Sequence, residues 1–139
     1  MRELNECLRL SRDINEINER LVELRYKILS PKNQIISDAP KGGGGPNNAI
    51  EEYIIKSERL EKRKAAITAR LDNCWAEALS VFKEREMPKT YISLMWYRFY
   101  KAHSWKKCIS DMKGQYPDEL WNENKIFRIY KTVNIKCKR

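Results

Sequence analysis

Apolar residues recur at alternating spacings of three and four in the first part of the chain, in one unbroken register. Arg, Glu, Asp and Asn side chains lie between them. A period of 3.5 residues is typical of a coiled-coil seam. Because a proline disfavours the helical conformation of the residue before it, Pro31 predicts a helix that ends near Leu29. We therefore predict a coiled-coil helix over residues 1–29. Its seam positions are Cys7, Leu10, Ile14, Ile17, Leu21, Leu24 and Ile28.

A second stretch keeps the same kind of register, with Ser57 and Lys64 as polar positions in its seam. Such residues often set register and partner number at a cost in stability. Asn47 or Asn48 is expected to cap the start of this helix, and residues 49–87 to form it. Since each helix has one apolar stripe, we expect the two to pair antiparallel, within one chain or between two. The seam positions are Ile50, Tyr53, Ser57, Leu60, Lys64, Ile67, Leu71, Cys74, Ala78 and Val81.

Four consecutive glycines lie between these helices, in the segment "SPKNQIISDAPKGGGGPNN" over residues 30–48. A phosphate-binding loop follows a strand and places a lysine and a hydroxyl after its last glycine. Here Lys41 precedes the glycines and the flanking segments are helical in pattern. We therefore predict a flexible linker. It is longer than most connections between bundle helices, which leaves a domain-swapped dimer open.

Residues 88–139 predict three short helices with aromatic residues in their core. The first is expected over about Lys89 to Lys101, and the second from an N-cap at Ser104 to a break at Gly114. The third would start at Asp118 or Asn122. The predicted fold class is all-α: two long coiled-coil helices, as a helical hairpin or a dimer arm, followed by a small three-helix helix-turn-helix domain. Core positions of the third helix are Ile126, Ile129, Tyr130 and Val133, and the other core aromatics are Trp96, Tyr97, Phe99, Tyr100, Trp105 and Trp121.

The net charge of +9 is concentrated in the last third of the chain. Residues 1–86 hold 16 Lys and Arg against 15 Asp and Glu, whereas residues 87–139 hold 12 against 4. A local basic field indicates a polyanionic partner, with nucleic acid first. A merely solubilising tail explains the terminal "KCKR", but explains less well the basic residues within an aromatic-rich folded segment.

Several other classes of function find no support in the sequence. No apolar run approaches the roughly 20 residues that span a bilayer, and the charged N-terminus is unlike a signal peptide, so we expect an intracellular protein with no membrane partner. The four cysteines, Cys7, Cys74, Cys108 and Cys137, form no C-x-x-C pair, and His103 is the only histidine, with no Asp or Cys at a recognisable spacing. We expect core thiols, no metal site, no cofactor and no catalytic residues. The chain is therefore not expected to be an enzyme.

The segments "LMWYRFY", "HSWKKCISDM" and "ENKIFRIYKTV" together resemble region 4 of bacterial sigma factors. With "SDAPKGGGGPNN" and "EEYIIKSERLEKRKAAI", the whole chain resembles the RinA/ArpU-type late transcription regulators of Gram-positive phages and prophages. The resemblance implies a DNA-binding regulator, an activator of late, packaging or lysis genes in the cytoplasm of a bacterial host cell. The chain departs from the pattern in its turn, "KGQYPDELWN", which is longer than the usual three or four residues.

The face of the last helix opposite its core, and the basic residues around it, are the candidate DNA-binding surface. Asn pairs with adenine and Arg or Lys with guanine in the major groove. Other cations would contact phosphates. The residues assigned to base reading are Asn122, Asn124, Lys125 and Arg128. Those assigned to phosphate contact are Lys101, Lys106, Lys107, Lys113, Lys131, Thr132, Lys136, Lys138 and Arg139.

Two alternatives to the regulator stay open from the sequence. A phage terminase small subunit, a DNA-packaging protein, also joins a helix-turn-helix to oligomerising helices, but usually in the reverse order. A coiled-coil interaction protein would use its seam and leave the basic end incidental. Double-stranded DNA is the expected partner; contact with RNA polymerase and a homodimer through the coiled coil are left open.

Overall fold

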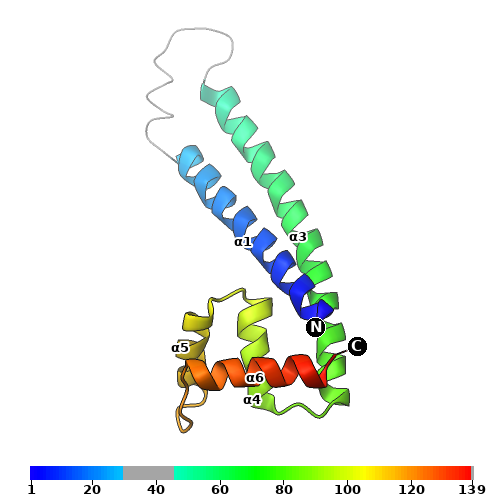
Figure 1. Cartoon of the computed structure of the whole chain (residues 1–139). Coiled ribbons are helices and arrows are strands. Elements are labelled where there is room, and N and C mark those ends of the chain that lie inside the picture. The colour runs from blue at the N-terminus through cyan, green and yellow to red at the C-terminus, as the bar shows by residue number, and fades with distance from the viewer. Residues whose placement is uncertain (30–45, 139) are drawn as a thin grey trace. The chain divides into compact units, whose positions relative to one another are not determined.

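The computed structural model describes residues 1–29 and 46–138 and is all-helical, with no strand among them. The predicted all-α class is confirmed. The glycine-rich part of the predicted linker, residues 30–45, and Arg139 lie outside the described residues. In chain order (Figure 1) the elements are α1 (Arg2–Leu29), α3 (Pro46–Glu84), α4 (Lys89–Met95), the π-helical segment η2 (Trp96–Tyr100), α5 (Trp105–Gln115) and α6 (Glu123–Lys136).

The chain forms two compact units whose limits fall inside the long helices. One unit consists of Asp13–Ile67, and the other of Met1–Arg12 together with Thr68–Arg139. The boundaries expected from the sequence, in contrast, follow the ends of the predicted helices. We call the first the helical-pair unit and the second the terminal unit.

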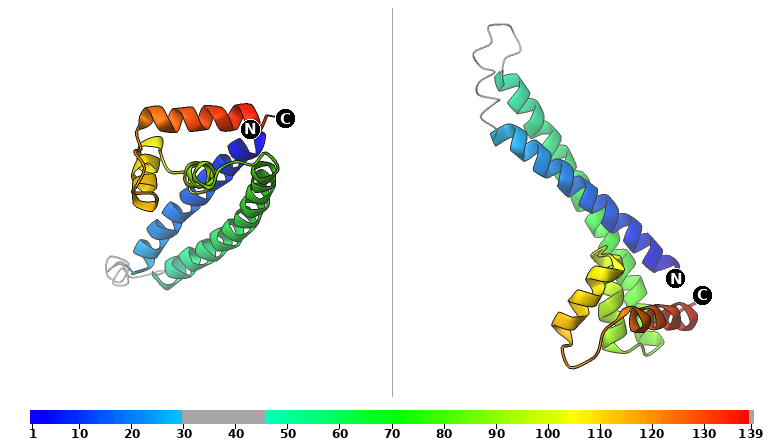
Figure 2. Two further views of the ribbon diagram at one scale, coloured as in Figure 1. Left: turned by 90° about the horizontal axis from the view of Figure 1, so that it is seen from below. Right: turned by 60° about the vertical axis from the view of Figure 1, so that its left-hand side comes forward.

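In the helical-pair unit, the segments of α1 and α3 lie side by side and run in opposite directions (Figures 1 and 2). Ile17, Leu21 and Ile67 are buried between them, and all three are predicted seam positions. Lys27 Nζ lies 5.6 Å from the ring centroid of Tyr53, another seam residue. The alternating pattern therefore identified the face on which these helices meet.

The terminal unit has a core that draws on both ends of the chain. Leu4, Cys7 and Leu10 of α1 are buried, and so is Phe82 of α3. The rings of Phe82 and Trp75 pack edge to face, with their centroids 6.0 Å apart. In this unit α4 packs against both α5 and α6, and α5 and α6 pack against each other. The other fully buried large side chains come from the C-terminal helices and include Leu94, Met95, Met112 and Val133.

The C-terminus of α3 closes with a Schellman motif. Met87 N donates to Phe82 O at 2.9 Å and Glu86 N donates to Lys83 O at 3.1 Å, while Glu86 adopts a φ of 56°. In this motif the residue after the cap is left-handed and the next one packs back on the helix. Met87 is accordingly buried. The prediction that the helix continues to residue 87 was wrong, because the motif ends it at Glu84 without a glycine.

Three other predicted helix ends need correction. α3 begins at Pro46, so Asn47 and Asn48 lie inside the helix, and proline suits a first helical position because no partner is needed for its nitrogen. Gly114 lies within α5, which ends at Gln115. The first C-terminal helix does not run regularly to Lys101, because its last turn widens into η2.

Candidate nucleic-acid interface

The π-helical segment η2 sets the direction in which the chain enters α5. Lys101 N donates to Trp96 O at 3.0 Å, one residue further along than an α-helical bond. Ala102 then takes a φ of 57°, which is uncommon for a residue with a side chain. π-Helical turns and left-handed alanines both carry strain, and both occur frequently near functional sites. Here Arg98 and Phe99 lie within the π-helical segment, and Ala102 follows it.

The start of α5 is held by side-chain hydrogen bonds. Ser104 Oγ accepts from Lys107 N at 3.1 Å, which confirms the predicted N-cap. His103 Nδ1 lies 2.6 Å from Asp111 Oδ2, and His103 O accepts from Arg98 Nη1 at 3.0 Å. No Asp stands at a recognisable spacing from His103 in the sequence, but Asp111, eight residues further along and on the second turn of α5, reaches it. These contacts fix Lys106 and Lys107, on the first turn, relative to η2.

The start of α6 is fixed by a second cap and by a tryptophan. Asn122 Oδ1 accepts from Lys125 N at 2.9 Å, so Asn122, of the two residues predicted, starts the helix. Trp121 is buried, and its Nε1 donates to Tyr116 O at 3.1 Å across the connection between α5 and α6. This hydrogen bond joins the two ends of the connection between α5 and α6.

The four residues assigned to base reading do not share one environment. The side-chain oxygen of Asn122 is occupied by its cap, and Lys125 Nζ lies 4.1 Å from the Trp121 ring and 3.6 Å from Glu119 Oε2. Asn124 and Arg128 are exposed on one face of α6, together with Phe127, whose exposed fraction is 70%. Base reading stays a prediction for all four; Asn124 and Arg128 have side chains available for it.

Most residues assigned to phosphate contact are exposed. Thr132 differs, because its hydroxyl donates to Arg128 O at 2.9 Å, and Lys101 Nζ lies 5.1 Å from the Trp96 ring. Within the described part of the C-terminal helices, none of these lysines makes an ion pair with a carboxylate. The exposed lysines are Lys101, Lys106, Lys107, Lys113, Lys131, Lys136 and Lys138.

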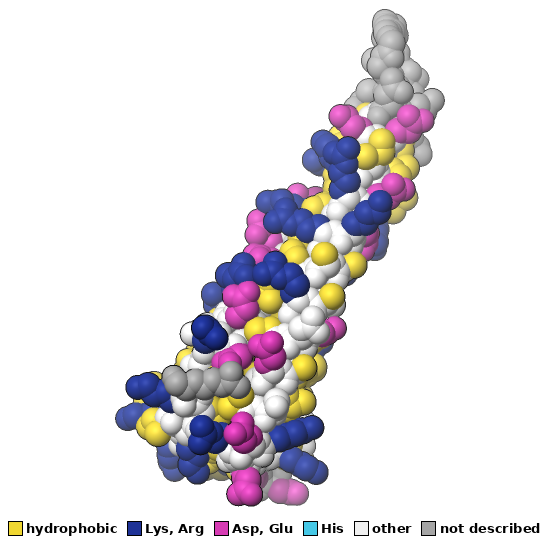
Figure 3. All heavy atoms as spheres, turned by 90° about the vertical axis from the view of Figure 1, so that its right-hand side faces the viewer, with side chains coloured by type: hydrophobic (Ala, Val, Ile, Leu, Met, Phe, Trp, Pro, Cys, Tyr) yellow, Lys and Arg dark blue, Asp and Glu magenta, His cyan; other side chains and the backbone are white. Residues whose placement is uncertain are grey.

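The helical-pair unit shows the opposite distribution of charge. Its described residues, 13–29 and 46–67, hold 8 Lys and Arg against 8 Asp and Glu, so its net charge is 8 − 8 = 0. Basic and acidic side chains alternate along the long helices in Figure 3. An example is the ion pair between Arg20 and Glu16, at 2.9 Å on α1. The uncompensated positive charge therefore lies in the terminal unit.

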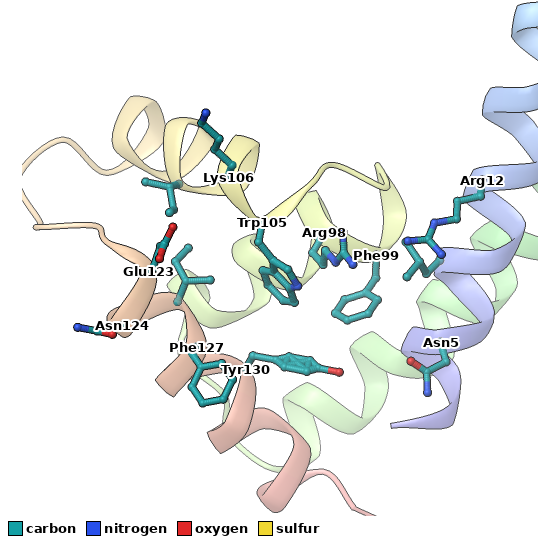
Figure 4. Close-up of a pocket in the computed structure, with 13 residues that line it drawn as sticks. Asn5, Arg12, Arg98, Phe99, Trp105, Lys106, Glu123, Asn124, Phe127 and Tyr130 are labelled. Carbon is teal, nitrogen blue, oxygen red and sulfur yellow. The ribbon is translucent and has the colours of Figure 1, made fainter.

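A pocket of about 670 Å³ opens beside this surface, within the terminal unit (Figure 4). Trp105 forms its centre: the Arg98 guanidinium carbon lies 4.8 Å from its ring, and Tyr130 meets it edge-on at 5.1 Å. The rings of Phe99 and Tyr130 are stacked, with their centroids 5.8 Å apart. Sequence reasoning missed Arg12, Arg98 and Phe127, which also line the pocket. Of these three, Arg98 could have been found from the sequence, because it is the single charged residue in the run "WYRFY".

The cysteines have the environment of core residues. Cys7, Cys108 and Cys137 are buried, and Cys74 is half-buried with its Sγ donating to Glu3 O at 3.2 Å. Burial raises the pKa of Cys108 to about 11, and burial likewise raises the pKa of Cys7 and Cys74. Thiols in this state are poor nucleophiles and poor ligands at neutral pH.

No three His, Cys, Asp or Glu side chains among the described residues form a group that could hold a metal ion. No helix in the part of the chain that the structure covers has the length and hydropathy needed to cross a bilayer.

Comparison of the chain with family models, curated proteins and solved structures found no match. The site is therefore interpreted from its own geometry and charge.

Proposed function

We propose that the chain is a DNA-binding transcription regulator of phage or prophage genes, acting in the cytoplasm of a bacterial host. In this proposal α4 with η2, α5 and α6 act as a helix-turn-helix domain. The observation that carries the proposal is the set of exposed lysines on α5 and α6, with Arg128, that form no ion pair with any carboxylate of the described residues. Phosphate groups of duplex DNA are the counter-charges that such a surface fits best.

α6 is the element proposed to enter the major groove. Asn124 and Arg128 are one helical turn apart on its exposed face, where their side chains could pair with adenine and guanine. Phe127 lies between them in sequence, and an exposed phenylalanine suits contact with a thymine methyl group. The cap at Asn122 and the bond between Trp121 and Tyr116 support this role, because they fix the first turn of α6 before DNA arrives.

α5 is proposed to position the domain on the sugar–phosphate backbone. Lys106 and Lys107 lie at its N-terminus, where backbone amides also favour anions. Two carboxylates near this surface have contacts within the domain: Asp111 Oδ2 lies 2.6 Å from His103 Nδ1, and Glu119 Oε2 lies 3.6 Å from Lys125 Nζ. Both carboxylates therefore already have partners within the domain.

The helical-pair unit is proposed as a coiled-coil hairpin that contacts a second copy or RNA polymerase. One observation favours such contact: Val22, Tyr26 and Leu29 lie at i, i+4 and i+7 on α1, and their exposed fractions are between 65% and 74%. This face differs from the seam that pairs with α3. It equally favours the second candidate function, a coiled-coil interaction protein that does not need DNA.

Selection from a random duplex library, followed by titration of the enriched sequence at two salt concentrations, tests the proposal. We expect one motif to be enriched and to bind well above random duplex, with both affinities falling as salt rises. Only weak, sequence-independent binding would contradict the regulator and favour the interaction protein.

A further inference from the structure

The pocket beside α5 and α6 combines aromatic walls with two arginines. Trp105, Phe99 and Tyr130 form its apolar side through the ring contacts given above, and Ile109 and Ile126 extend it. Its volume of about 670 Å³ lies within the range of 300–1,000 Å³ typical of small-molecule sites. Planar rings bind well against such walls, because stacked and edge-on contacts both gain dispersion energy.

The cationic side of the pocket comes from Arg12 of α1 and Arg98 of η2. Figure 4 shows both side chains in the same part of the pocket, near Phe99. Neither forms an ion pair with a carboxylate in the described residues. Burial lowers the pKa of Arg98, and the positive charge of Arg12 lowers it further, so an anion between them would relieve an unfavourable contact.

Not every N–H group of Arg98 has a hydrogen-bond acceptor among the described residues. Nη1 donates to His103 O and the guanidinium plane lies over Trp105, whereas the buried Nε has no acceptor among the described residues. Buried polar atoms are nearly always hydrogen-bonded, so this one calls for a functional explanation. Glu123 is the one acidic residue in the lining, against three basic ones, Arg12, Arg98 and Lys106.

We propose that this pocket binds a small organic anion with a planar aromatic body and a carboxylate or phosphate group. The aromatic body would lie against Trp105 and Tyr130, and the anionic group would be held by the guanidinium groups of Arg98 and Arg12. Paired guanidinium donors suit the planar oxygens of a carboxylate or the oxygens of a phosphate. The pocket is lined entirely by the terminal unit, and it shares Lys106, Asn124 and Phe127 with the proposed DNA-binding surface, so ligand binding is measured without DNA.

The test uses four probes on the full chain in the absence of DNA. Benzoate and phenyl phosphate carry both a ring and an anion; benzyl alcohol carries only the ring, and inorganic phosphate only the anion. The readout is the indole N–H signal of Trp105 in a ¹H–¹⁵N NMR spectrum. The chain has 4 tryptophans, so this signal is assigned with the Trp105→Phe variant.

We expect a saturable shift of the Trp105 signal with benzoate or phenyl phosphate, and weaker binding of both single-feature probes. Arg98→Met should weaken binding about tenfold, the effect of one charge-assisted hydrogen bond. Arg128→Met is the matched control, because Arg128 is exposed on α6 outside the lining, and should leave affinity unchanged. Should Arg98→Met fail to fold, Arg12→Met, at an exposed position, takes its place.

Three results would overturn the proposal. The first is no saturable shift of Trp105 with either aromatic anion. The second is binding of inorganic phosphate as tight as that of phenyl phosphate, which would mean general attraction to a basic surface. The third is an equal effect of the pocket variant and Arg128→Met.

Discussion

The hydroxyl of Ser11, on α1, donates a hydrogen bond of 2.6 Å to the carbonyl oxygen of Tyr100, the last residue of η2. The two residues are 89 positions apart, and the bond joins the N-terminal part of α1 to the segment that leads into α5. Ser11 is buried, and the hydrogen bond is partly shielded from bulk water. The first turns of α1 therefore belong to the structure that presents the candidate interface.

Ser11→Ala should destabilise the protein by about 0.5–1.5 kcal/mol, because it removes the donor of a partly buried hydrogen bond to the carbonyl of Tyr100. Urea unfolding measures the difference. Ser110→Ala, at an exposed position on α5, is the matched control and should change stability by less than about 0.5 kcal/mol. Equal stability of the two variants would show that the bond is not maintained in solution.

Separate substitutions of Asn122 and Asn124 distinguish helix capping from base reading. Asn122→Ala should cost about 1 kcal/mol of stability by removing the cap, and Asn122→Ser should largely retain it. Asn124→Ala should leave the melting temperature nearly unchanged and weaken binding to the selected duplex. A loss of sequence preference in the stable Asn122→Ser variant would instead restore Asn122 to the reading set.

Arg128→Ala and Lys138→Ala should have different effects on DNA binding. Loss of Arg128 should reduce affinity for the selected sequence about tenfold or more, while binding to random duplex falls less. Loss of Lys138 should weaken both slightly and lower the salt slope by about one. Fluorescence anisotropy on both duplexes measures the pair. Equal, small losses for both variants would contradict the assigned face of α6.

Tyr100 should make stability depend on alkaline pH. Its hydroxyl donates to Asp72 Oδ1 at 2.6 Å, and this bond, with burial, raises the pKa of Tyr100 from 10.0 to about 12. The raised pKa favours the folded state fully below pH 10, and this contribution is lost as the pH rises from 10 to 12.

Tyr100→Phe should therefore lose about 0.5–1 kcal/mol at pH 7 and show a shallower decline between pH 10 and 12. Thermal unfolding across this range measures it. Tyr26→Phe, at a position with an exposed fraction of 74%, is the control and should follow the parent chain. A parallel decline of the parent and Tyr100→Phe would exclude the tyrosine as its source.

Glu86→Gly should stabilise the protein by about 0.5–1 kcal/mol, because Glu86 holds a left-handed conformation that costs a side-chain-bearing residue energy. The gain is reduced by the greater entropy of glycine in the unfolded chain. Urea unfolding provides the measurement, with Glu84→Gly inside α3 as a control that should destabilise. Destabilisation by both would show that the Schellman geometry is absent.

The parts of the fold that sequence periodicity predicted are those in which one local face dominates. Ile17, Leu21 and Ile67 are buried on the predicted seams, and Ile126, Ile129 and Val133 on the predicted face of α6. The caps at Ser104 and Asn122 were also predictable, since a short polar side chain before an apolar-periodic run supplies the missing acceptor by itself.

The helix ends that depend on distant packing were not predictable from the sequence. α3 stops at Glu84 because Met87 packs back on it, and η2 widens where α1 supplies the Ser11 hydroxyl. Pro88 signals an end near residue 87, but no glycine marks the left-handed Glu86, and no glycine or proline marks η2. The pairing of His103 with Asp111 was missed for the same reason, since it depends on the bend at Ala102.

The sequence by itself determined the all-helical class, the two seam faces, two of the caps and the concentration of positive charge in the last third. These follow from periodicity, capping and composition, which act over a few residues at a time. Tertiary structure decided which residues make one compact unit, which of the predicted reading side chains have partners within the protein, and that Arg12 and Arg98 line one pocket. Those outcomes depend on contacts between residues far apart in the chain, whose burial and hydrogen bonds no local pattern specifies.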